Sequence, residues 1–427
     1  MNRVAPDASL EAARAAEAAA RRSYGKLIAF LAARTRDVAG AEDALSEALA
    51  AALTDWPMHG VPQTPDAWLL TVARRKLVDS ARQRRRADGA AEQLLCLSEL
   101  ATGEEEDSAL PDRRLGLLFA CTHPGIDPAV RAPLMLQVVL GFDAATIASA
   151  FLVAPATMGQ RLSRAKAKIR QAGIGFEVPE RSALRERLQS VLDAIYAAYA
   201  EGWTDPEGAD ARRRNLADEA IWLGRLVASL LPDEGEALGL LSLMLHAHAR
   251  RDARRDPQGD YVPLGRQDPA CWDAAMIDEA EALLSRANGC DGIGRFQLEA
   301  AVQSAHAVRR HRGGADWPAI EQLYDALCEL TGSPVAALNR AVAQAESRGP
   351  GAGLAALDTL AGDARLTDYQ PYWAARADLL ARCGKTDAAQ AYQRAIGLER
   401  DPAVRRFLQQ RAAAAAAGNA APPGGIQ

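Results

Sequence analysis

The sequence predicts an all-α protein built from several helical domains. Hydrophobic residues make up 49% of the chain, whereas aromatic residues make up only 5%. Alanine is abundant and runs of β-branched residues are scarce, which favours helices over strands. Apolar residues also recur at i, i+3 and i+4 along most of the chain, the spacing of one helix face. The length of 427 residues is enough for two or three domains with sizeable cores.

Composition also limits where the protein can act. The longest apolar stretches, such as APLMLQVVLGF at 132–142, are too short to span a membrane. The first residues contain acids and no apolar core, so we expect no signal peptide and a flexible lead at 1–20. The cysteines are scattered, without a C-x-x-C pair, which indicates reduced thiols in the cytoplasm. They are Cys96, Cys121, Cys271, Cys290, Cys328 and Cys383.

Residues 37–53 carry the first strong helix signal, a single apolar stripe of Ala and Leu. Glu42, Asp43 and Glu47 lie off that stripe and predict an acidic face turned away from the packed side. A loop is expected at 55–65, where three prolines and a glycine exclude regular structure. Such an acidic face is either a solvated helix surface or a docking surface.

A basic run follows, VARRKLVDSARQRRR at 72–86, in which seven of the residues are Arg or Lys. We expect a helix that starts at about Asp66, with Leu69 and Leu77 facing a core and the arginines on another side. The whole chain has a net charge of −5, so this run is a local concentration of positive charge. A solvated helix face is the ordinary explanation, and nucleic-acid binding is the alternative.

The next segments form a linker and a second basic unit. Residues 88–112 include the acidic block Glu104 to Asp107 and predict a linker. Two short helices are expected in 113–141, broken at THPGIDP. A helix, a short turn at 152–154 and a second helix opened by Pro155 then match the helix-turn-helix pattern. The second helix has a buried stripe of Met158, Leu162, Ala165 and Ile169, and a polar face that includes Thr157, Arg161, Arg164 and Lys168.

From about residue 180 onward, amphipathic helices follow one another without a strand signal. Small and large residues alternate near the end of the chain much as in a tetratricopeptide unit, and Ala341 and Ala377 occupy matching places. We therefore predict a helical repeat domain over 180–412. The low-complexity end at 413–427 is expected to be a disordered tail.

Three stretches together resemble a known family: AEDALSEAL, PDAWLLTVARRKLVD and TIASAFLVAPATMGQRLSRAKAKIR. They are similar to regions two and four of extracytoplasmic-function sigma factors, members of the bacterial sigma factor family. The long helical extension resembles the subgroup with a C-terminal tetratricopeptide-like domain. The resemblance implies region two at 21–87, region four at 113–173, and regulation by the C-terminal domain.

The resemblance also implies a role for each matching position. The helix that docks on core RNA polymerase corresponds to Glu42, Asp43, Ser46 and Glu47. The part that melts and recognises the −10 element corresponds to Trp68, Arg74, Arg75, Lys76, Asp79, Arg82, Arg85 and Arg86. The −35 recognition helix corresponds to Thr157, Gln160, Arg161, Arg164 and Lys168. The family often has other residues at Ser46, Arg75 and Thr146, and the first two differences bear on a polymerase contact and on the −10 sequence preference.

The expected partners are thus core RNA polymerase and promoter DNA, and a protein or peptide ligand of the C-terminal domain is a further candidate. That domain could bind such a ligand in a groove, fold back on the DNA-binding domains, or only stabilise the chain. Two other classes remain open: a stand-alone helix-turn-helix regulator and a tetratricopeptide-type scaffold. We expect no enzymatic activity, no cofactor and no metal, because no nucleophile–base set is evident and the His and Cys pairs spaced two apart point away from each other on a helix.

Overall fold

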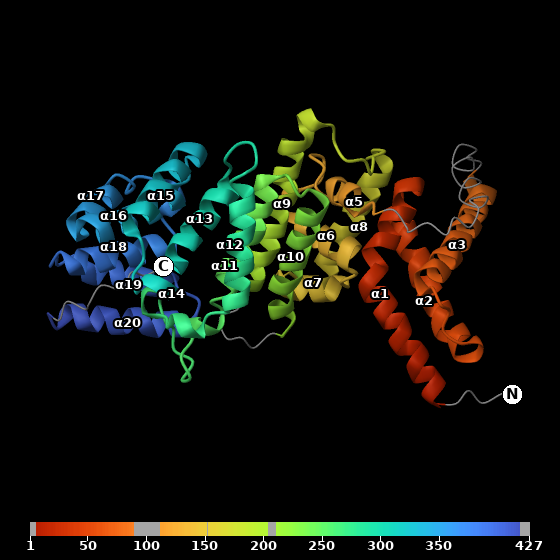
Figure 1. Cartoon of the computed structure of the whole chain (residues 1–427), viewed down its shortest axis with the longest axis horizontal. Helices are drawn as coiled ribbons and strands as arrows, with labels where there is room; N and C mark the ends of the chain where they lie inside the picture. The colour runs from red at the N-terminus through yellow and green to blue at the C-terminus, as the bar shows by residue number, and fades with distance from the viewer. Residues whose placement is uncertain (1–5, 89–111, 152, 204–210, 419–427) are drawn as a thin grey trace. The chain divides into compact units, whose positions relative to one another are not determined.

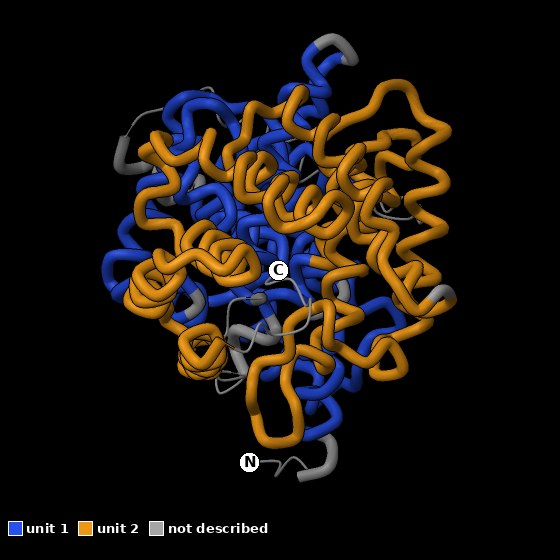
Figure 2. The backbone as a smooth tube through the Cα atoms, turned by 90° about the vertical axis from the view of Figure 1, so that its left-hand side faces the viewer, with its two compact units in different colours: residues 1–203, 212–220 blue, residues 204–211, 221–427 orange. Residues whose placement is uncertain are grey.

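The computed structural model describes residues 6–88, 112–151, 153–203 and 211–418. These residues form helices joined by short loops (Figure 1), and the one β-type pairing among them is an isolated antiparallel bridge between Arg255 and Tyr261. The all-α prediction is confirmed. The chain divides into two compact units, coloured separately in Figure 2: unit 1 is 1–203 with 212–220, and unit 2 is 204–211 with 221–427.

Unit 1 begins with a long helix, α1 (Pro6–Thr35), where the sequence predicted a flexible lead over 1–20. That prediction is wrong for the residues that the structure describes. Ala12, Ala16 and Ala19 recur at helical spacing and are all buried, so this segment contributes an apolar face to the core.

Helices α2 (Val38–His59) and α3 (Pro65–Asp88) complete the first bundle. The carboxylate of Asp37 caps α2 by accepting from the Gly40 amide. The loop predicted from residue 55 starts later, because α2 continues through Pro57 and ends at Gly60, which has a φ of 88°. Trp56 explains the longer helix, since its ring is buried and packs edge-on against Trp68 of α3.

The second bundle of unit 1 is made of four shorter helices and one long one. They are α5 (Arg114–Cys121), α6 (Pro128–Leu140), α7 (Ala144–Ala150), α8 (Pro155–Gln171) and α9 (Arg181–Trp203). The break predicted between two helices at THPGIDP is confirmed, and Asp127 and Asp143 cap the helices that follow them. The sequence assigned α9 to the C-terminal domain, but it packs on α5 and α6, and Arg187 donates to the Phe119 carbonyl at 2.8 Å.

Unit 2 is a succession of helices in which chain neighbours pack on each other. α10 (Ala211–Leu230) runs from unit 1 into unit 2. The others are α11 (Gly235–His248), α12 (Ala274–Ala287), α13 (Arg295–Ala307), α14 (Arg309–Arg312), α15 (Trp317–Thr331), α16 (Pro334–Arg348), α17 (Pro350–Asp358), α18 (Gln370–Arg382), α19 (Ala388–Leu398) and α20 (Pro402–Ala416). A long connection between α11 and α12 holds three short 3₁₀ turns: η1 (Asp252–Arg254), η2 (Leu264–Arg266) and η3 (Pro269–Cys271). A fourth, η4 (Ala364–Leu366), precedes α18.

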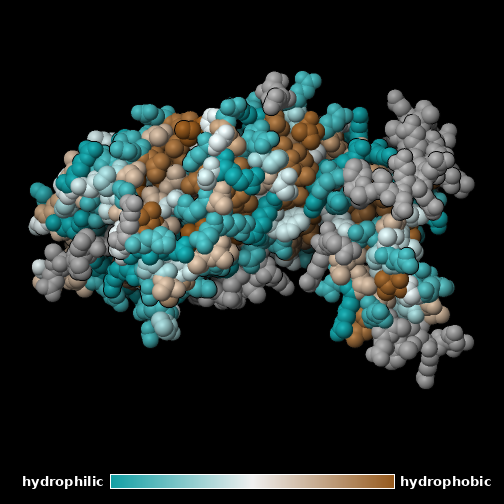
Figure 3. Space-filling model, viewed as in Figure 1, coloured by the Kyte–Doolittle hydropathy of each residue, from teal (hydrophilic) through white to brown (hydrophobic). Residues whose placement is uncertain are grey.

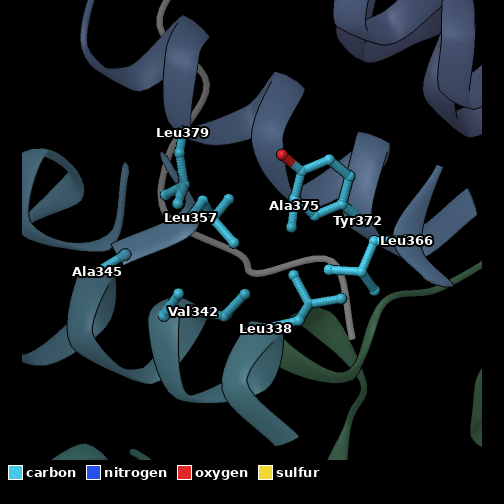
Figure 4. Packing of buried hydrophobic residues seen from close by; sticks show 9 residues of the cluster. Leu338, Val342, Ala345, Leu357, Leu366, Tyr372, Ala375 and Leu379 are labelled. Carbon is cyan, nitrogen blue, oxygen red and sulfur yellow. The ribbon is translucent and has the colours of Figure 1, made fainter. Parts of the chain in front are cut away.

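Small residues allow these helices to approach closely. Figure 4 shows Leu338, Leu357 and Leu379 meeting between α16, α17 and α18. A Cβ added at Gly353 would lie 2.6 Å from the Ala341 carbonyl oxygen, so α17 can pack here only through a glycine. The predicted helical extension is therefore confirmed, while its tetratricopeptide character stays a prediction. α20 reaches Ala416, so part of the predicted tail is helical, and 419–427 lies outside the described residues.

In the view of Figure 3, hydrophilic side chains cover much of the visible face, with apolar areas between them. Among the described residues, no helix is long and apolar enough to cross a membrane.

Candidate polymerase and nucleic-acid interfaces

Helix α3 carries the basic run. Leu69, Ala73 and Leu77 are buried and fix the rotation of the helix. Arg75 and Asp79 are therefore exposed. Arg82, Arg85 and Arg86 follow on the same helix, but their side chains fall outside the described part of the structure.

Trp68 stands at the start of this basic surface and is partly buried. Its ring centroid is 5.5 Å from that of Trp56, with 67° between the ring planes. Trp56 was not singled out from the sequence, because the prolines around it predicted a loop. The edge-on contact holds Trp68 in place, and the residue as a whole is neither fully buried nor fully exposed.

Two other cations of α3 differ in their surroundings. Lys76 forms an ion pair with Glu47 of α2 at 3.0 Å, and both side chains are about half exposed. Arg74 instead lies over the ring of Phe30, a residue of α1, with its Cζ 4.9 Å from the ring centroid. Burial, and then the charge of Arg34, lower the pKa of Arg74.

The predicted acidic face of α2 has an exposed part and a buried part. Asp43, Ser46 and Glu47 are exposed, as the pattern predicted. Glu42 is only 9% exposed, and its carboxylate accepts from the Lys166 ammonium of α8 at 2.6 Å. The prediction of a solvated side chain is wrong for Glu42, because α8 covers this end of the face.

Glu42 lies where α2 of the first bundle contacts α8 of the second. Burial raises the pKa of Glu42, and the adjacent Lys166 offsets this only in part. Burial and the Glu42 charge also raise the pKa values of Tyr24 and Cys121. A second, looser pair joins Asp37 and Arg170 at 3.5 Å, so both acid–base contacts link the start of α2 to α8.

Backbone packing joins the same bundles through α1 and α6. A Cβ added at Gly25 would lie 2.3 Å from the Val139 carbonyl oxygen. Tyr24 lies against Gly141, whose φ of 76° ends α6. Main-chain atoms of the two helices are thus in contact. A residue with a Cβ in place of Gly25 would not allow this close approach.

Helix α8 presents its polar face to solvent. Met158, Leu162, Ala165 and Ile169 are buried as predicted. All five residues predicted for DNA recognition are exposed, namely Thr157, Gln160, Arg161, Arg164 and Lys168. Lys166 was not predicted as a functional residue; it lies between these two faces and points to Glu42.

Other chemistry finds little support in the described residues. No group of three or more His, Cys, Asp or Glu residues among them is placed to hold a metal ion. The acidic block of the 88–112 linker lies outside the described residues.

In a comparison with known proteins, two family models match parts of the chain. Residues 20–87, which include α2 and nearly all of α3, match sigma-70 region 2. Residues 187–288 match a family of unknown function, DUF6596, which covers much of α9 and extends through α12. No solved structure shows a significant match.

A relative matches almost the whole chain. It is the uncharacterized protein R00370 of Rhizobium meliloti (strain 1021), 38% identical over 381 residues, with 87% of this chain and 89% of the relative covered. The similarity therefore covers most of the chain. The chain thus belongs to one family with R00370, and within it residues 20–87 match sigma-70 region 2.

Proposed function

We propose that this protein binds core RNA polymerase in the cytoplasm and directs promoter-specific initiation of transcription, without an enzymatic step of its own. The observation that carries the proposal is the match of 20–87 to sigma-70 region 2, on helices that expose Arg75 beside the partly accessible Trp68. Aromatic and guanidinium planes can stack on unpaired bases, which suits the −10 element once it is melted.

We assign the −35 element to helix α8. Its exposed face combines three cations, Arg161, Arg164 and Lys168, with Thr157 and Gln160 and no acid. Cations supply contacts to phosphates, and arginine, glutamine and threonine can donate to base edges in the major groove. The capped α7 and the start of α8 at Pro155 support a helix-turn-helix arrangement.

We assign docking on core polymerase to Asp43, Ser46, Glu47 and Glu42 of α2. Because Glu42 is covered by Lys166, this assignment requires α8 to leave α2 before all four residues can be reached. A polymerase that binds Glu42 would then also separate α8 from α2.

We propose that unit 2 regulates these steps, by a protein or peptide ligand or by folding back on unit 1. Its support is the succession of helices with buried small residues, which commonly builds extended binding surfaces. The alternative, which the experiment has to exclude, is that unit 2 only stabilises the chain.

In vitro transcription tests the proposal. Purified core polymerase is combined with the full-length protein on fragmented genomic DNA, and the transcript starts are mapped. Discrete starts that share −35 and −10 elements are expected. A fragment that ends after residue 203 keeps α9, which packs on α5 and α6, and it tests whether unit 2 inhibits or activates. Binding of duplex DNA without polymerase, and no initiation with it, would favour a stand-alone helix-turn-helix regulator.

A further inference from the structure

Phe30, near the end of α1, carries two guanidinium groups on one ring. The Cζ atom of Arg34 is 5.1 Å from the ring centroid, and that of Arg74 is 4.9 Å away. Phe30 itself is only 5% exposed, so the ring is a fixed part of the core. The ring therefore contacts two cations from different helices, α1 and α3, whose charges interact with each other.

Within the part of the chain that the structure describes, no acidic side chain pairs with these two charges. Neither Arg34 nor Arg74 forms an ion pair among the described residues, whereas the nearby Lys76 is paired with Glu47. The Nε atom of Arg74 is buried and has no hydrogen-bond partner in that part of the chain. Repulsion between Arg34 and Arg74 contributes to the lowered pKa of Arg74. An anion that contacts both guanidinium groups would relieve this repulsion.

We propose that Arg34 and Arg74 together bind one backbone phosphate of a single DNA strand. The pair is called the Phe30 clamp here. It extends the basic surface of α3 onto α1, and it adds Arg34 to the residues that contact DNA. The proposal rests on the proposed function only for the identity of the strand, the melted −10 region. Stacking on the ring restricts both side chains before the phosphate arrives, so little side-chain freedom is lost on binding.

A sequence-neutral probe tests the clamp in the full-length protein. Binding of a fluorescent oligothymidylate is measured by anisotropy over a series of salt concentrations. Arg34→Ala and Arg74→Ala are each expected to weaken binding roughly tenfold, as a lost charge-assisted contact does. Each should also reduce the slope of log K against log salt by about 0.7, the value for one phosphate on a single strand.

A matched control separates the clamp from general charge. Arg14 lies exposed on the same helix, so Arg14→Ala removes the same charge from α1 away from Phe30. It should change affinity by no more than about twofold, because exposed charges far from the contact are screened. Equal effects of Arg34→Ala and Arg14→Ala would overturn the proposal, provided that unchanged far-UV circular dichroism shows both variants to be folded.

The double variant tests whether one phosphate is shared. If both arginines hold the same phosphate, the double variant should lose much less than the product of the two single losses, about a hundredfold. A full product would mean two separate contacts and would overturn the clamp. Arg34→Lys should restore part of the affinity, since it keeps the charge and loses the planar stacked group.

The transcription assay keeps the two hypotheses apart. Initiation by the wild type, with no effect of Arg34→Ala on oligothymidylate binding, would reject the clamp alone. The opposite result is a loss of oligothymidylate affinity in Arg34→Ala together with no initiation by the wild type. It would reject the sigma-factor proposal and leave the clamp in place.

Discussion

Two buried carboxylates, Glu42 in unit 1 and Asp378 in unit 2, have different partners. Glu42 is paired with a single cation, Lys166, and burial still raises its pKa. Asp378 is 4% exposed and contacts two guanidinium groups, those of Arg411 and Arg382. Arg382 in turn binds Glu346 of α16 at 2.5 Å, so the charges around Asp378 form a network.

The different number of basic partners indicates that the Glu42 contact can open more easily than the Asp378 network. Removing a carboxylate from water is costly, and only close, multiple partners compensate for it. Asp378 has such partners and joins α18 to α20 within one stack. Glu42 is less well compensated, so separating α2 from α8 returns its charge to water and regains part of the desolvation cost. The same residue types thus form a structural network around Asp378 and, at Glu42, a contact that can open and take another partner.

The largest effect is expected from breaking the Asp378 network. Asp378→Asn leaves the buried guanidinium group of Arg411 without its carboxylate, while Arg382 keeps only Glu346, and the free energy of unfolding should fall by about 3–5 kcal/mol. Denaturant titration of the full-length protein measures this. Asp368→Asn is the control, because Asp368 pairs with Arg394 on the surface and should cost less than about 1 kcal/mol. Similar losses in both variants would show that the Asp378 network is not important for stability.

The next effect concerns pH and two histidines of unit 2. Burial, and then the charge of Arg250, lower the pKa of His246 and of His306 to about 3 from the ordinary 6.5. Both are neutral in the folded state, and the unfolded chain binds their protons below about pH 6.5. Unfolding should therefore become easier as the pH falls, by about 1.4 kcal/mol for each histidine between pH 7.5 and 5.5.

Urea titrations at the two pH values measure this loss, and a His246→Gln, His306→Gln variant should lose most of the pH dependence. Glu42 acts in the opposite direction. Its raised pKa gives a contribution to stability that is complete below its unfolded pKa and is lost as the pH rises through its folded pKa. An unchanged pH dependence in the double histidine variant would contradict the prediction.

A smaller effect is expected at the contact between α1 and α6. Gly25→Ala places a Cβ against the Val139 carbonyl oxygen, which should cost about 1–3 kcal/mol, partly offset by the better helix propensity of alanine. Gly159→Ala in α8 is the matched control, since its Cβ would meet open space and should stabilise by about 0.5–1 kcal/mol. Hydrogen exchange should speed up in α6 only in the first variant. Equal protection of α6 in both variants would exclude a close α1–α6 contact.

The smallest effect on stability is expected at the exposed end of the acidic face. Glu47→Ala removes a half-exposed ion pair with Lys76 and should cost less than about 1 kcal/mol. Under the proposed function, the same variant should bind core polymerase more weakly than the wild type, while its unfolding midpoint hardly moves. Unchanged binding to polymerase would remove Glu47 from the proposed docking surface.

Local patterns predicted much of the site. The buried stripe of α8 and its exposed polar face followed from spacing alone, because the helix period of 3.6 residues assigns each position to a face. The start of α3 at Pro65 also followed from local preference. The continuation of α2 through Pro57 did not, since burial of Trp56 against Trp68 outweighs the missing proline N–H.

The sequence by itself determined the helical class, the start of α3 and the division of α8 into a buried stripe and an exposed polar face, because these depend on residues that are neighbours along the chain. Only the tertiary structure decided the surroundings of Glu42 and Arg74. The partner of Glu42 is 124 residues away in sequence, and Arg34 and Arg74 come from different helices to the Phe30 ring. Burial and charge compensation depend on which residues pack against a side chain, and the periodicity of one helix does not identify those residues.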